Sequence, residues 1–187
     1  MGDYNLTGLS TRSFEQLIQS LCCRVLGAGT VVFGDGPDGG REATYTGRLS
    51  NFPSETTCWD GYVVVQAKFC QRPKGKTKED QEWVLTQLKK ELTAFAARGT
   101  KRKRPDYYIL ATNVVLSPAQ NGGGKDKASQ LIEKFTKEIG LKDYRIWDHD
   151  QICRYIDCDH SIRAAYAAWI TPGDVLAKLA WIPMLVY

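Results

Sequence analysis

The segment that most constrains this fold is residues 62–69, Tyr-Val-Val-Val-Gln-Ala-Lys-Phe. Its valines are apolar without alternation, which is typical of a strand covered on both faces. Because strand side chains repeat every second residue, Gln66 and Lys68 should lie on one side of this strand. A buried lysine needs acidic groups or a metal nearby, although a lysine at a strand end can also extend into water. The segment therefore predicts a central strand with a polar site at its end.

A turn rich in Gly, Pro and Asp precedes this strand in the sequence. It covers residues 34–40 and leads into a second expected strand at residues 42–46. Asp38 lies in the turn and Glu42 opens the strand. An acid at the start of one strand and a Gln-x-Lys at the end of its hairpin neighbour can converge on one point.

Three segments together resemble the Mrr-like branch of the PD-(D/E)xK nuclease superfamily. In that family a helix glutamate precedes a D-G-G-x-D/E turn and a Q-x-K strand. This chain has Glu15 in an expected helix, the turn Asp38-Gly39-Gly40-Arg41-Glu42, and the strand end Gln66-Ala67-Lys68. From about residue 4 to about residue 176, the sequence is also similar to the N-terminal effector nuclease of bacterial antiviral STAND NTPases.

The resemblance implies a Mg²⁺- or Mn²⁺-dependent endonuclease that hydrolyses DNA, acting as the effector of an antiviral defence protein. Lys68 would orient or deprotonate the attacking water and stabilise charge. The implied metal ligands are Glu42, Asp38, Gln66 and Glu15, and the implied supporting residues are Gln87 and Arg41. Between the two turn acids we expect Glu42 to be the principal ligand, because Asp38 precedes two glycines and suits a turn-shaping role.

Two basic segments follow the central strand, a loop at 72–78 and a run at 98–104. Such runs are either solvated loops or a rim that binds phosphates, and the net charge of +4 alone does not decide between them. The candidate DNA contacts are Lys74, Lys76, Lys78, Arg102, Lys103 and Arg104.

The hydrophobic periodicity predicts an α/β fold with a mixed β-sheet flanked by helices. The resemblance implies that this sheet is restriction-endonuclease-like, with helices on both faces. The expected strands are residues 30–33, 42–46, 62–69, 107–115 and 144–148. The expected helices begin at residue 10 or 13 and run to 26, then span 78–97, 125–139, 151–156 and 161–170. Residues 47–60 are expected to form a polar, proline-containing connection.

A chain of 187 residues suits one domain. We expect a nuclease domain at 1–172 and, at 173–187, an apolar tail or linker to a following domain. That tail suggests a homo-oligomer, or activation through a C-terminal STAND ATPase or sensor region. The sequence shows no signal peptide and no bilayer-spanning apolar run, so we expect a cytoplasmic protein without membrane contact.

Two other functions remain open from the sequence. One is a nuclease-like fold that binds nucleic acid or a protein without cutting it. The other is a small-molecule or nucleotide hydrolase, for which the chain has no phosphate-binding fingerprint and no Ser-containing nucleophile elbow. Cys153, Cys158 and His160 form a weak zinc pattern that also suits plain helix residues.

Overall fold

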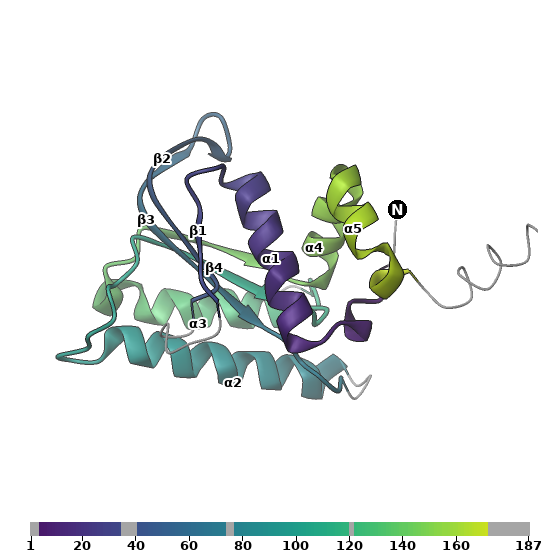
Figure 1. Ribbon diagram of the computed structural model, residues 1–187. Coiled ribbons are helices and arrows are strands. Elements are labelled where there is room, and N and C mark those ends of the chain that lie inside the picture. Colours follow the sequence, from purple (N-terminus) through teal and green to yellow (C-terminus); the bar gives the residue numbers. More distant parts are fainter. Residues whose placement is uncertain (1–3, 35–40, 74–76, 120–121, 172–187) are drawn as a thin grey trace, which may run out of the picture.

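The computed structural model describes residues 4–34, 41–73, 77–119 and 122–171. They form a three-layer α/β/α arrangement around one sheet (Figure 1). The strands are β1 (Val31–Val32), β2 (Ala43–Pro53), β3 (Cys58–Lys68), β4 (Tyr107–Thr112) and β5 (Asp143–Trp147). The helices are η1 (Leu6–Gly8), α1 (Thr11–Val25), α2 (Thr77–Ala96), α3 (Gly124–Ile139), α4 (His149–Cys158) and α5 (His160–Ile170).

The five strands lie in the sheet in the order in which they occur in the chain. β1, β2 and β3 pair antiparallel, whereas β3, β4 and β5 pair parallel through the crossovers that α2 and α3 provide. The predicted α/β class, with a mixed sheet and helices on both faces, is therefore confirmed. β3 lies at the centre, and three of its valines are fully buried, which explains its unbroken apolar run.

Each face of the sheet has its own hydrophobic core. On one face, α1, α4 and α5 pack against the alternate residues Val63 and Val65 of β3. On the other face, α2 and α3 pack against Tyr62 and Val64. Because side chains alternate along a strand, Gln66 and Lys68 belong to the α2 face.

The expected connection at 47–60 is wrong, because these residues continue the hairpin. β2 extends to Pro53 and β3 begins at Cys58, so only a short turn separates them. Gly47 faces Gly61 across the hairpin, and both have positive φ, 129° and 151°. A Cβ at Gly61 would lie only 2.7 Å from Asp106 Oδ2, so only glycine fits where β3 approaches the β4 entry.

Helix starts follow from their capping residues. Ser10 accepts a hydrogen bond from the backbone N–H of Ser13 and begins α1. Asp148 and Asp159 cap α4 and α5 in the same way. Among the described helices, none is long and apolar enough to cross a membrane.

Candidate functional site

The end of β3 forms the centre of the candidate site. Gln66 is completely buried, whereas the Lys68 side chain retains 15% of its exposure. Lys68 is level with Thr112, the last residue of β4, so it lies at the carboxyl end of the parallel part of the sheet. Ligand sites of open α/β sheets commonly occur at this edge.

Glu42 reaches the same place from the neighbouring strand. Its backbone N–H donates to the Val65 carbonyl at 3.0 Å, and the next residue, Ala43, pairs with Val65. Glu42 therefore lies directly before β2, beside the end of β3, and its charge acts on Tyr108, the partner of Gln66. The Glu42 side chain is buried. The structure thus brings together three of the predicted site residues, namely Glu42, Gln66 and Lys68.

A fourth residue, Glu91 of α2, faces Gln66 and Lys68. Lys68 Nζ lies 2.8 Å from Glu91 Oε1, and Gln66 Nε2 donates to Glu91 Oε2 at 3.0 Å. Arg102 Nη1 also pairs with Glu91, at 2.8 Å from Oε2. One carboxylate therefore joins the strand end, the helix and the basic run at 98–104.

The orientation of the Gln66 amide follows from its two neighbours. Tyr108 donates its hydroxyl proton to Gln66 Oε1 at 2.7 Å, and the amide nitrogen faces Glu91. A flipped amide would place its oxygen against a carboxylate that has no proton to donate. Gln66 therefore presents its amide oxygen to Tyr108 and its amide nitrogen to Glu91.

The charges around this cluster shift two pKa values. Burial acts to raise the pKa of Glu91, but the hydrogen bond and charge of Lys68, with hydrogen bonds from Gln66 and Arg102, hold it below the ordinary value. Burial, followed by the negative charges of Glu91 and Glu42, raises the pKa of Tyr108 well above its usual range. Glu91 is therefore the ionised partner, and Tyr108 remains a neutral hydrogen-bond donor.

The basic run is in large part engaged with the protein itself. Arg102 pairs with Glu91, and Arg104 donates to the carbonyls of Phe95 and Ala96 at the end of α2. Lys103 lies over the Tyr62 ring, with Nζ 4.0 Å from its centroid. Their expected role as DNA contacts stays a prediction.

The other predicted residues lie around or outside this cluster. Glu15 is half-buried on α1, which covers the opposite face of the sheet from α2. Arg41 donates to the Tyr62 hydroxyl at 3.1 Å. Lys78 is exposed, and Gln87 is half-buried one turn before Glu91. Asp38, Lys74, Lys76 and the tail at 173–187 lie outside the described residues.

The donor types at the site suit a hard divalent cation. Mg²⁺ and Mn²⁺ prefer carboxylate, amide and water oxygens, and Glu42 and Gln66 carry a carboxylate and an amide oxygen. Within the described ranges, no three His, Cys, Asp or Glu side chains gather as a metal-binding group. Asp38, an expected ligand, is not among the described residues.

Sequence reasoning missed Glu91 and Tyr108. A signal for Glu91 was present, because it lies on the apolar stripe of α2 that Val84, Leu88 and Phe95 form at helical spacing. An acid on such a stripe indicates a buried partner. Tyr108 gave no such signal, since an aromatic residue in a buried strand is ordinary.

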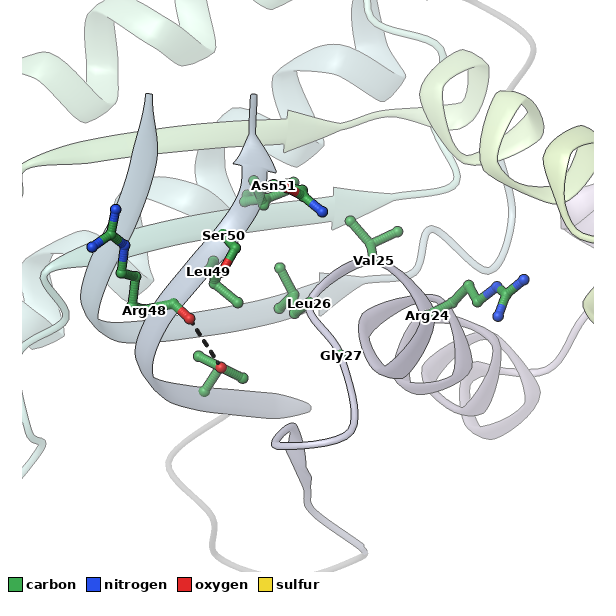
Figure 2. Close-up of a pocket in the computed structure, with 10 residues that line it drawn as sticks. Arg24, Val25, Leu26, Gly27, Arg48, Leu49, Ser50 and Asn51 are labelled. Carbon is green, nitrogen blue, oxygen red and sulfur yellow. Dashed lines mark hydrogen bonds between the residues drawn. The ribbon is translucent and has the colours of Figure 1, made fainter. Parts of the chain in front are cut away.

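Two cavities lie elsewhere. One, of about 290 Å³, lies between the end of α1 and β2 (Figure 2). Figure 2 shows Arg24 and Arg48 extending to opposite sides of it, with Leu26 and Leu49 between them. The other, also about 290 Å³, lies beyond the end of β4 and is lined by Asn113 and His149.

Comparisons of this chain with protein-family models, with curated proteins and with solved structures found no match.

Proposed function

We propose that this chain is a metal-dependent endonuclease that hydrolyses phosphodiester bonds of DNA. The observation that carries the proposal is the position of Gln66 and Lys68 at the end of β3, with the backbone of Glu42 bonded to the neighbouring residue Val65. A carboxylate, an amide oxygen and a lysine at one strand end are the parts that metal-assisted phosphodiester hydrolysis requires. By the sequence resemblance, we extend the proposal to an effector domain of an antiviral defence protein.

In this proposal Glu42 and Gln66, with Asp38, would hold Mg²⁺ or Mn²⁺. The bound cation would activate a water molecule and neutralise charge on the phosphate. Lys68 keeps part of its side chain exposed, so its ammonium can approach a substrate phosphate and stabilise the charge that develops there. Tyr108 and Glu91 hold Gln66 from both ends of its amide.

The decisive experiment is plasmid cleavage by the purified protein with Mg²⁺, with Mn²⁺ and with EDTA. Lys68→Ala should lower the cleavage rate by about 100-fold or more, because a cation that acts mainly in the transition state is removed. Lys89→Ala is the matched control, since Lys89 is an exposed lysine on α2. Circular dichroism checks that each variant is folded. Cleavage by Lys68→Ala at the wild-type rate would refute the nuclease proposal.

A second candidate is a nuclease-like module that binds DNA without cutting it. The ion pair between Lys68 and Glu91 favours this candidate, because the ammonium already has a carboxylate partner at 2.8 Å. The same plasmid assay separates the two functions when a gel-shift measurement is added. Salt-dependent binding without cleavage in either metal would establish the binding module. Parallel reactions with single-stranded DNA and RNA define the substrate class.

A further inference from the structure

The buried position of Glu91 calls for a reason beyond packing. On the stripe of α2 between Leu88 and Phe95, a leucine would fill the core, whereas a buried carboxylate is unfavourable unless its partners compensate for the lost water. Glu91 is only 9% exposed. We therefore attribute the presence of this buried acid to the contacts that it makes at the end of β3.

Those partners are two residues of the proposed active site and one from outside it. Glu91 Oε1 accepts a hydrogen bond from Lys68, and Oε2 accepts hydrogen bonds from both Gln66 and Arg102. The long Lys68 side chain would otherwise sample many rotamers. The contact with Glu91 confines the ammonium to one place at the carboxyl end of β3, beside the amide of Gln66.

We propose, building on the proposed nuclease function, that Glu91 is a positioning residue that fixes Lys68 and Gln66 for cleavage. Arg102 then acts through Glu91, as the second cation that holds the carboxylate in place. This assigns Arg102 a role different from that of a direct phosphate contact.

The sign of the charge makes the proposal testable. Glu91→Gln keeps the shape of the side chain but removes a negative charge close to the expected DNA path. DNA binding should therefore stay unchanged or become tighter. The cleavage rate at saturating DNA should nevertheless fall by about 10- to 100-fold, because a displaced catalytic group loses its alignment. Removing an acid that only repels DNA, or one far from the site, would not lower the cleavage rate while leaving DNA binding unweakened.

Arg102 and Lys101 provide a matched pair of cations. Lys101 is exposed, whereas Arg102 contacts Glu91. Arg102→Ala should lower kcat and leave the salt dependence of DNA binding nearly unchanged. A phosphate contact would instead reduce the slope of log affinity against log salt by about one unit. Lys101→Ala should leave kcat at the wild-type value.

The experiment measures kcat and DNA affinity for wild type, Glu91→Gln, Glu82→Gln, Arg102→Ala and Lys101→Ala. Glu82 is the control carboxylate, because it is exposed on the same helix. Reduced kcat with unweakened binding in both Glu91→Gln and Arg102→Ala is the expected result. Wild-type kcat in a folded Glu91→Gln protein would overturn the positioning role. Absence of cleavage by the wild-type protein would be a different failure, that of the proposed function.

Discussion

At the scale of single residues, the surroundings of His149 favour its charged form. Its Nε2 lies 3.0 Å from the Tyr4 carbonyl, and its Nδ1 lies 3.3 Å from Asp150. Cys153 Sγ is 3.7 Å from Nδ1. The contact with Cys153, followed by the Tyr4 carbonyl and Asp150, raises the pKa of His149 to about 9, against the opposing effect of burial.

This shift predicts a pH-dependent contribution to stability. Because the pKa is higher in the folded state, the stabilisation is fully present below pH 6.5 and is lost as the pH rises through about 9. The difference in free energy of unfolding between wild type and His149→Gln should therefore decrease by about 2 to 3 kcal/mol between pH 6 and pH 10. Urea titrations at several pH values measure it. His160→Gln, which replaces an exposed histidine, is measured in parallel.

The sequence predicted part of the site for a clear reason. A strand places every second residue on one face, so Gln66 and Lys68 could be assigned to one side from their spacing alone. Their partner in α2 could not be assigned in this way. The choice between Gln87 and Glu91 depends on how α2 is rotated about its axis against the sheet, and long-range packing sets that rotation. The resemblance favoured Gln87, whereas Glu91 makes the contacts.

At the scale of elements, the end of α2 is held by a residue from the following loop. Arg104 donates through Nε to the Phe95 carbonyl at 3.1 Å and through Nη2 to the Ala96 carbonyl at 3.3 Å. The last carbonyls of a helix lack partners within it, and a cation there also interacts favourably with the helix dipole. Arg104 therefore serves as a C-terminal cap for the helix that carries Glu91.

We accordingly expect Arg104→Ala to lower the free energy of unfolding by about 1 kcal/mol. Chemical denaturation monitored by circular dichroism measures this loss. Arg98→Ala provides the comparison, because Arg98 is an exposed arginine near the same helix end. Equal stabilities of the two variants would contradict the capping role.

The elements themselves were largely predictable, and the β2–β3 hairpin shows where prediction failed. The expected helix at 125–139 differs from α3 by one residue at its start, because apolar periodicity and the stop at Gly140 define it locally. The outer part of β2 combines exposed polar residues with the buried Leu49 and Phe52, and it contains Gly47 and Pro53. Those residues are typical of a loop. They nevertheless form a strand because they pair with β3, and local residue preferences do not predict that pairing.

At the scale of the whole molecule, each chain carries one proposed site, whereas a DNA duplex has two strands. Two sites related by a two-fold axis can break both strands at one place. The predicted homo-oligomer would supply this arrangement. The edge strand β1 also exposes Val31 and Val32, at 56% and 46%, on the open side of the sheet.

Bringing two copies together should therefore change the product of cleavage. Without a fused dimerisation segment, we expect the protein to be weakly active and to nick supercoiled plasmid. Fusion to a dimeric coiled coil should raise the ratio of linear to nicked plasmid by about 10-fold, since the effective concentration of the second site becomes high. A fusion carrying Lys68→Ala is the control for contaminating nucleases. Equal product ratios for the two proteins at one concentration would contradict a need for paired sites.

The sequential order of the strands bears on how this chain folds. Each strand pairs with the one made just before it, so the sheet can grow from β1 toward β5 without waiting for a distant segment. Contacts between the two ends of the chain break this pattern: the Asn5 N–H donates to the Ile170 carbonyl at 2.9 Å, and His149 Nε2 lies 3.0 Å from the Tyr4 carbonyl. During synthesis these contacts of the segment before α1 can therefore form only after α4 and α5 have left the ribosome.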